Sequence, residues 1–315
     1  MRATAIPAAT GCNMIQITAL ICTRNRPRQI LEAVRSLLIG ADGSMELIVL
    51  DQSPNGDTEA ALSPLRNEPR VRYVRSPTIG KGVALNQGLE LANGSILVLT
   101  DDDCVAPPGW VRHMAQLFET RPRVAVVFCN VVPVEHDRQR GYVPCYERTH
   151  DRLITSLWEL RSGLGLGAGM AIRSDVVRGL GGFDEAFGPG GRFPSADDWD
   201  IAVRALIGGW HVYESAELSI THDGYRSFQQ GREHALRDWI ALGAASAKPL
   251  RAGHWPAASV PLLFYPTRAL WPPCRDLLQL RRPRGLKRVT AYLQGFVEGM
   301  ATPLDQRSLK FRGAP

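Results

Sequence analysis

The fold of this chain is decided by one stretch, Ser95-Ile96-Leu97-Val98-Leu99-Thr100-Asp101-Asp102-Asp103. A continuous apolar run of this kind is typical of a strand that is buried on both faces of a parallel sheet. The three carboxylates that follow cannot be buried without partners, so the strand should end at a surface or a cleft. Clustered carboxylates at a strand end suit a divalent cation that holds a phosphate, although an isolated acidic triplet is more often a solvated turn.

The segments around this strand alternate between strand and helix patterns. Apolar strands are predicted at residues 16–22, 45–50 and 71–74, with a helix after Pro27 and another from about residue 80 to 92. This order predicts a parallel sheet. Because the carboxyl ends of parallel strands share one edge, the polar residues that follow them should line one cleft. These residues are Thr23, Arg24, Asn25, Arg26, Asp51 and the acidic triplet.

A second acidic group, Asp197, Asp198 and Asp200, opens a predicted helix. The apolar stripe of that helix has the spacing of a buried face and consists of Trp199, Ala202, Val203 and Leu206. Asp197 and Asp198 lie outside the stripe. Ser195 and Asp198 have the spacing of a capping box, which explains the residues structurally. A carboxylate at a helix start beside a cleft could instead act as a general base, and on the residues alone capping is the simpler explanation.

His222 follows a short apolar run and precedes Asp223-Gly224. A lone histidine is more often structural than a ligand, but a neutral imidazole can join carboxylates on Mn²⁺ or Mg²⁺, and Mn²⁺ is the softer of the two. Glycine clusters at residues 163–169 and 179–182 lack the Lys-Ser/Thr ending of a phosphate-binding P-loop. They indicate a wall on the acceptor side of a cleft or simple loop connections.

The composition is that of a globular protein with one large domain or two small ones. The chain has 315 residues, of which 44% are hydrophobic and 22% charged. The six cysteines show no paired metal-type spacing, and Cys22 and Cys129 lie in apolar runs, which indicates reduced thiols in a cytosolic protein. We find no secretory signal pattern and no run near the roughly 18 to 20 apolar residues that span a bilayer.

Charge divides the chain unevenly. Residues 224–315 contain 15 Lys and Arg against 5 Asp and Glu, a local charge of +10, whereas the remainder has 22 against 26, a charge of −4. A basic tail suggests an anionic partner, and this one lacks a nucleic-acid-binding motif. Its aromatic residues favour an anionic lipid surface, and a docked helical appendage with a solvated basic face is the alternative. The predicted organisation is a loosely packed N-terminus at 1–14, a catalytic domain at 15–223 and a basic amphipathic extension at 224–315.

Together these motifs resemble those of family 2 glycosyltransferases with the GT-A fold, over roughly residues 15–223. Thr23-Arg24-Asn25-Arg26-Pro27 resembles the family's first nucleotide loop, and Asp51 falls where its aspartate contacts the base. Gly80-Lys81-Gly82 with Ala84-Leu85-Asn86-Gln87-Gly88 resembles the segment near the diphosphate, and Asp101-Asp102-Asp103 matches the DxD motif. Asp197-Asp198 stands in place of a Glu-Asp pair whose second member is the base. Asp197 therefore replaces a glutamate, and Leu85 stands where many relatives have arginine.

The resemblance implies an α/β fold: one Rossmann-like GT-A domain with a mostly parallel central sheet, followed by a mainly helical C-terminal extension. It implies that the nucleotide sugar is bound by Thr23, Arg24, Asn25, Arg26, Asp51, Lys81, Asn86, Asp101 and Asp102. It also implies metal binding by Asp103 and Asp101, acceptor binding by Asp197 and Trp199, and a general base at Asp198; His222 is added as a metal ligand on the chemistry of its imidazole.

The activity implied is inverting transfer of a sugar from a nucleoside diphosphate to a hydroxyl of a glycan, lipid-linked or cell-envelope acceptor, with Mn²⁺ or Mg²⁺ and no nucleic-acid partner. We expect a cytoplasmic protein, at the inner face of the membrane if the tail binds lipid. One rival is a sugar-phosphate nucleotidyltransferase, although the glycine-rich loop of that family is missing before Cys22-Thr23-Arg24. The other rival is a non-catalytic, membrane-associated nucleotide-binding protein.

Overall fold

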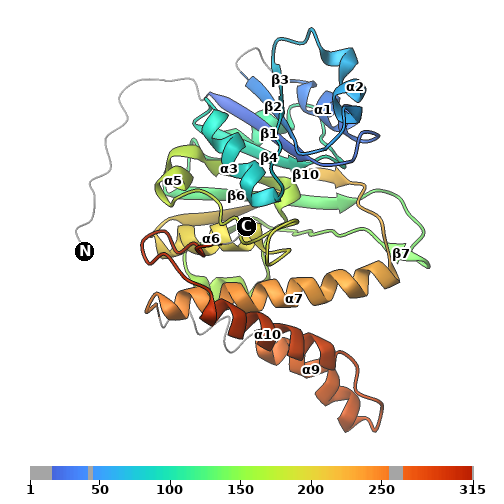
Figure 1. The fold of residues 1–315 in the computed structure, drawn as a ribbon, viewed down its shortest axis with the longest axis vertical. Helices are drawn as coiled ribbons and strands as arrows, with labels where there is room; N and C mark the ends of the chain where they lie inside the picture. The colour runs from blue at the N-terminus through green and yellow to red at the C-terminus, as the bar shows by residue number, and fades with distance from the viewer. Residues whose placement is uncertain (1–15, 42–44, 255–264, 314–315) are drawn as a thin grey trace.

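The computed structural model describes residues 16–41, 45–254 and 265–313. The predicted loose N-terminus at 1–14 lies outside these residues. A nine-stranded sheet forms the centre of the molecule, and helices cover both of its faces (Figure 1). Three long helices from the C-terminal part lie below this sheet domain.

The first half of the chain forms the strand and helix alternation that the sequence predicts. The predicted strands at 16–22, 45–50, 71–74 and 95–100 are confirmed to within a residue or two at each end, and the first helix begins three residues after Pro27. The elements are β1 (Ile17–Thr23), α1 (Ile30–Leu38), β2 (Met45–Asp51), α2 (Asp57–Ala61), β3 (Val71–Arg75), α3 (Lys81–Leu91) and β4 (Ile96–Asp101).

The second half is less regular and ends in the helical region. Its strands and the helices between them are β5 (Cys104–Val105), α4 (Trp110–Gln116), β6 (Val124–Pro133), β7 (Gly141–Tyr142), β8 (Arg152–Ile154), β9 (Met170–Arg173), α5 (Ser174–Gly179), α6 (Asp197–Ile207), β10 (His211–His222) and β11 (Arg226–Ser227). The C-terminal helices are α7 (Phe228–Arg251), α9 (Tyr265–Leu278) and α10 (Leu286–Ala301).

The sheet has the order β3-β2-β1-β4-β9-β6-β10-β5, and β8 pairs with β10. The block β3-β2-β1-β4 is wholly parallel, as predicted, and β10 is parallel to β6. Strand β9 is antiparallel to β4 and β6, between which it lies, and β5 and β8 are antiparallel to β10. The sheet is therefore mixed, and its antiparallel strands β5, β8 and β9 all follow the parallel block in the sequence.

Strand register brings the polar strand ends to one edge. Thr23 lies opposite Asp51, and Cys22 lies opposite Asp101. Side chains alternate along each strand, so that Leu20 packs on one face while Ala19 and Ile21 pack on the other. Helices α1 and α4 cover the second of these faces and α3, α6 and α7 the first. Because both faces are covered, the central strands must be apolar throughout and their charged residues can stand only at the ends.

Helix α7 extends the core, and α10 packs on α7. A Cβ atom at Gly295 would lie 1.9 Å from the carbonyl oxygen of Ile240, and one at Gly243 would lie 2.1 Å from that of Tyr292. Only glycine allows the two helix backbones to approach this closely. The first part of the predicted C-terminal extension is thus docked on the sheet domain.

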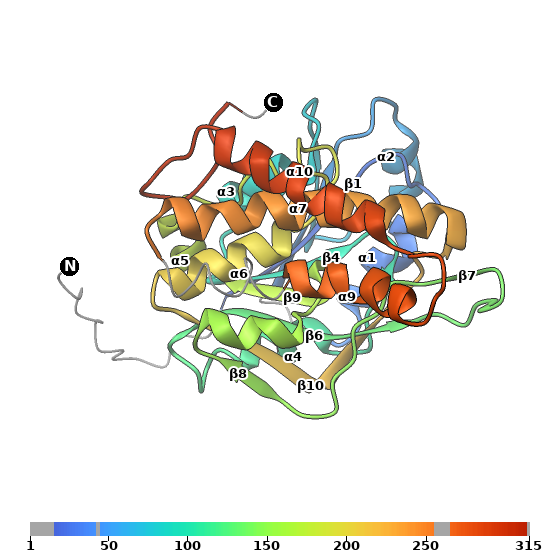
Figure 2. The ribbon, with the colours of Figure 1, turned by 90° about the horizontal axis from the view of Figure 1, so that it is seen from below.

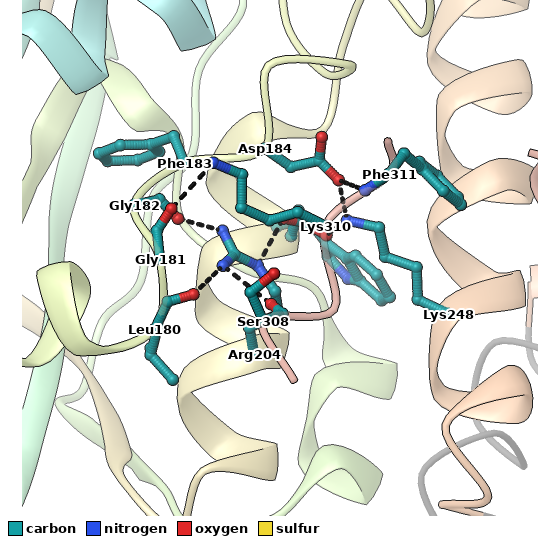
Figure 3. Close-up of polar contacts among 12 residues, drawn as sticks. Leu180, Gly181, Gly182, Phe183, Asp184, Arg204, Lys248, Ser308, Lys310 and Phe311 are labelled. Atoms are coloured by element: carbon teal, nitrogen blue, oxygen red, sulfur yellow. Dashed lines mark hydrogen bonds and ion pairs between the residues drawn. The ribbon is translucent and has the colours of Figure 1, made fainter. Parts of the chain in front are cut away.

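A buried charge cluster attaches α7 to α6 and to the loop before α6 (Figure 3). The Lys248 Nζ atom of α7 lies 2.5 Å from an oxygen of Asp184 and 2.5 Å from an oxygen of Asp200. Arg204 donates to the other Asp200 oxygen at 2.9 Å and to the Gly182 carbonyl at 2.6 Å. Burial would raise the pKa of Asp184, but Lys248 outweighs it and holds that pKa below its usual value. Each charge in the cluster therefore has a partner of opposite sign.

We expect Lys248→Met to lower the free energy of unfolding by about 3 to 5 kcal/mol, because it leaves two buried carboxylates without their shared cation. Urea denaturation followed by circular dichroism measures this change. Lys287→Met, at an exposed position on α10, is the matched control and should change stability by less than about 0.5 kcal/mol. Equal stability of the two variants would show that the cluster does not anchor α7.

Candidate functional site

A cavity of about 720 Å³ opens at the carboxyl edge of the sheet. The ends of β1, β4 and β10, the start of α6 and the first half of α7 contribute its lining. The carboxylates of the acidic triplet share this cavity with Asp197 and Asp198, although the two groups are almost 100 residues apart in sequence. His222 lies in the same wall. The gathering of distant acidic residues that the sequence pattern suggested is therefore present.

The loop after β1 neutralises part of the acidic triplet. The Thr23 hydroxyl donates to Asp102 at 2.6 Å, and Arg26 donates to Asp102 at 3.0 Å and to Asp103 at 2.5 Å. Asn25, at a φ of 59°, is left-handed and turns the loop so that Arg26 can reach back. Burial raises the pKa of Asp102 to about 6 in spite of Arg26. Asp102 thus joins the ends of β1 and β4, and its environment disfavours the charged form.

Asp103 and His222 face each other across the β5–β10 pair. An oxygen of Asp103 lies 3.4 Å from Nε2 of His222. The Nδ1 atom of His222 donates to the Pro144 carbonyl at 2.9 Å, so Nε2 faces Asp103; it donates to that carboxylate in the protonated ring and offers a lone pair in the neutral ring. Burial acts to raise the pKa of Asp103, but the hydrogen bond and charge of protonated His222, together with Arg26, lower it to about 2. The carboxylate is therefore ionised at neutral pH.

A potential metal site is formed by this pair together with the Cys104 thiol, since the ligand atoms of Asp103, Cys104 and His222 lie within 4.8 Å of one another. Burial raises the pKa of the Cys104 thiol, which keeps it protonated and makes it the weaker ligand. A carboxylate and an imidazole with a fixed tautomer fit a divalent ion such as Mn²⁺. Asp101, the other predicted metal ligand, is engaged elsewhere.

Lys81 links the two acidic groups of the cavity. Its Nζ atom lies 2.7 Å from Asp101 and 3.9 Å from Asp197. Burial would lower the pKa of Lys81, but the two carboxylates outweigh it and raise that pKa well above its usual value. Lys81 therefore keeps its positive charge in the cavity, where it would attract a phosphate.

The start of α6 differs from the capping interpretation. The N-cap of α6 is Ala196, at a φ of 65°, and no side chain accepts a capping hydrogen bond there. The predicted capping box of Ser195 and Asp198 is therefore wrong. One oxygen of Asp198 instead accepts from the Gly167 amide at 2.8 Å, and the other accepts from the Trp199 amide at 2.7 Å.

These contacts fix the Asp198 carboxylate at the cavity wall. Burial, and after it the negative charge of Asp197, raises the pKa of Asp198 to about 6. The value expected for an ordinary aspartate, about 3.9, therefore does not apply here. A carboxylate whose pKa is raised toward neutrality is a stronger proton acceptor that is still mostly ionised at pH 7.

The structure places Asp51 and Asn86 behind the cavity lining. Asp51 is fully buried and accepts from the Ser53 amide at 2.8 Å and the Tyr73 hydroxyl at 2.8 Å. Asn86 donates to the Phe183 carbonyl at 3.0 Å and accepts from the Phe183 amide at 2.7 Å. Both side chains are thus engaged in holding neighbouring loops, and Asn25 is likewise absent from the described residues that line the cavity.

Other lining residues were missed by the sequence analysis. Gln52, one residue after Asp51, faces the cavity and donates to the Thr78 hydroxyl at 2.9 Å. The first half of α7 contributes His234, Arg237 and Asp238. Only their helical spacing could have indicated that these three residues share a face, and nothing in that spacing shows which surface the face meets.

The chain belongs to glycosyl transferase family 2, whose family model matches residues 18–180. A curated relative, the glucosyl-dolichyl phosphate glucuronosyltransferase of Haloferax volcanii, is 22% identical over 258 residues, which is 74% of this chain and 81% of that protein. The pre-mycofactocin glycosyltransferase of Mycobacterium tuberculosis is 29% identical over 195 residues, but the match covers 59% of this chain and only 37% of that protein.

Solved structures show the same fold. The mannosyltransferase PcManGT from Pyrobaculum calidifontis, in complex with GDP-Man and Mn²⁺, superposes with a TM-score of 0.60 at 19% identity, covering 92% of this chain and 88% of that chain. S. aureus TarS 1-349 in complex with UDP-GlcNAc gives a TM-score of 0.65 at 14% identity, covering 91% and 82%. The GT-A fold predicted from the motifs is confirmed.

We expect the Asp198 carboxyl to titrate with a midpoint near 6 in the metal-free protein, and Asp197→Asn to lower that midpoint because it removes a neighbouring negative charge. Nuclear magnetic resonance of protein labelled with ¹³C-aspartate measures both values. Asp175→Asn, on the exposed side of α5, is the control and should leave the midpoint unchanged. A midpoint near 4 in the wild type would contradict the environment described for Asp198.

Proposed function

We propose that this chain transfers a sugar from a nucleoside diphosphate to an acceptor hydroxyl with inversion of the anomeric centre, with Asp198 as the general base. The observation that carries the proposal is the shared cavity: Asp198, Lys81 and the Asp103–His222 pair all line it. A proton acceptor and a phosphate-binding group are the two elements that such a displacement needs.

Asp198 is suited to the acceptor side of the reaction. Its two backbone hydrogen bonds hold the carboxylate in place, and a pKa of about 6 favours proton transfer from a hydroxyl. The acceptor oxygen would form a bond to the anomeric carbon while the bond from that carbon to the phosphate oxygen breaks, and the hydroxyl proton would pass to Asp198. A single in-line displacement of this kind inverts the anomeric configuration.

Lys81 and the acidic triplet are suited to the donor side. The ammonium group of Lys81 can meet the negative charge that develops on the leaving diphosphate. Asp103 and His222 would hold a divalent ion, which in such a site acts as a Lewis acid toward the phosphate oxygens. Imidazole ligation favours Mn²⁺ over Mg²⁺. Thr23, Arg24 and Arg26, beside the triplet, are proposed to contact the nucleotide.

The names of the relatives support a nucleotide-sugar donor, and one of them also supports a lipid-linked acceptor. The names of the two solved neighbours include GDP-Man and UDP-GlcNAc as bound donors, and the name of the Haloferax relative includes a dolichyl phosphate acceptor. We propose a glycan or lipid-linked acceptor on this basis. The family assignment disfavours a nucleotidyltransferase, whose signature is release of pyrophosphate from a nucleoside triphosphate.

We expect Asp198→Asn to lower the rate of transfer by about 10² to 10⁴ while changing donor affinity less than about threefold, since the amide cannot accept the proton. UDP-, GDP- and dTDP-sugars would be screened first by calorimetry with Mn²⁺, and transfer then measured with the donor that binds. Asp175→Asn serves as the control at an exposed aspartate. Equal transfer by wild type and Asp198→Asn would exclude this residue as the base.

We expect Asp103→Ala and His222→Ala each to weaken donor binding in Mn²⁺ by about tenfold or more, because each removes a metal ligand. In EDTA the same variants should bind the nucleotide about as well as the wild type does in EDTA. Calorimetric titrations in the two buffers provide the comparison. If Mn²⁺ does not strengthen donor binding in the wild type, the metal assignment is wrong.

A further inference from the structure

The outer surface of the α9–α10 hairpin is apolar where it faces away from the protein. The hairpin lies on the far side of α7 from the sheet domain (Figure 1), and it is in front in the view from below (Figure 2). Helix α10 buries Ala291, Tyr292, Gly295 and Gly299, and its glycines contact α7. This face of α10 therefore packs against α7 and holds the hairpin on the protein.

The opposite face of α10 carries an apolar stripe without cover. Leu286, Leu293, Val297 and Met300 are 51%, 54%, 65% and 41% exposed. At 3.6 residues per turn these four positions lie roughly opposite the face that packs on α7. Their direction is thus set by the glycine contacts, which prevent the helix from rotating to bury them.

Helix α9 and the turn that follows also carry large exposed apolar side chains. Trp271 is 63% exposed, Leu278 is 81% exposed and Leu280, in the turn, is 98% exposed. Leu280 also has a φ of 53°, a left-handed conformation that glycine or asparagine adopts at lower cost. Leu280 is therefore a large apolar side chain that no part of the described chain covers, although its backbone conformation is strained.

Positive charge surrounds the same surface. Residues 268–288 contain seven Arg and Lys and a single acidic residue, Asp276, which gives a formal charge of +6. The Asp276 side chain is buried, and Arg284 donates to both of its oxygens at 2.9 Å and 3.0 Å. The remaining basic side chains therefore dominate the electrostatic potential around the exposed leucines.

We propose that the α9–α10 hairpin docks on the surface of an anionic lipid bilayer. Its leucines and Trp271 would enter the interfacial layer, and its arginines would contact lipid phosphates. Within the described residues no helix is both long and apolar enough to cross a membrane. A second copy of the chain fits less well, because symmetric pairing would bring two surfaces of charge +6 together.

This proposal is independent of the sugar-transfer proposal, since bilayer binding requires neither donor nor acceptor. Vesicles of phosphatidylcholine, with and without phosphatidylglycerol, are the probe, and the protein that sediments with them is measured. We expect the wild type to bind the phosphatidylglycerol vesicles and to bind less as salt rises, because salt screens the arginines. No binding to these vesicles would overturn the proposal.

The apolar part of the surface is tested with the double variant Leu278→Glu/Leu280→Glu. It should reduce vesicle binding at least about tenfold, because it removes two leucines that would be buried in the bilayer. Ile39→Glu, a 55% exposed position after α1, is the control and should bind as the wild type does. All three positions are exposed, so circular dichroism should show the native fold in each variant. Equal loss in both variants would contradict a specific docking surface.

The basic part is tested with Arg281→Glu/Arg282→Glu, which should weaken binding about fivefold or more for each arginine. Arg66→Glu/Arg72→Glu makes the same change in net charge at exposed positions near β3 and should have a much smaller effect. Equal effects of the two double variants would show that the net charge of the protein alone explains vesicle binding. That result would overturn the assignment of the docking surface to the hairpin. A dimer that dissociates when Leu278 and Leu280 are replaced would overturn it in favour of self-association.

Discussion

The structure depends on the pairing of carboxylates with cations that bridge segments from different parts of the chain. Arg26 bridges Asp102 and Asp103, Lys81 bridges Asp101 and Asp197, and Lys248 bridges Asp184 and Asp200. Burial of these carboxylates is offset by their cations, so each bridge fixes the relative position of the elements that carry it. The first two bridges face the cavity, where a ligand or metal can share the charges. The Lys248 bridge is buried where α7 packs against α6, and it stabilises the fold.

The sequence predicted the parallel half of the sheet well because burial on both faces leaves a clear pattern. The apolar run of β4 and the polar residues after it follow from the same physical constraint, and the shared edge follows from the parallel register. Strand β9 was not recognised, since its four residues carry too little pattern to show an antiparallel insertion. His222 could be named as a candidate, but only the β5–β10 pairing brings it to Asp103.

The sequence indicated the carboxylates that line the candidate site, but it did not indicate the residues around them. The roles expected for Asp51 and Asn86 came from motif positions, whereas in the structure their side chains hold loops behind the cavity. The capping box failed because Ala196 adopts a left-handed conformation and takes the N-cap position, which frees Asp198 to bind the glycine loop. The basic tail left two interpretations: α7 and α10 are docked, as expected for a helical appendage, whereas binding of an anionic lipid surface by the exposed faces of α9 and α10 stays a proposal.

A metal held by Asp103 and His222 should belong to one site with the carboxylate of Asp198. Paramagnetic broadening of backbone amide signals by Mn²⁺ tests it directly, because broadening depends on distance from the bound ion. The account predicts that the amides of Cys104 and Thr221 broaden first and those of Gly167 and Trp199 next, while the amides of Leu286 and Leu293 on α10 stay sharp. Broadening centred on any other surface, with Gly167 and Trp199 unaffected, would contradict it.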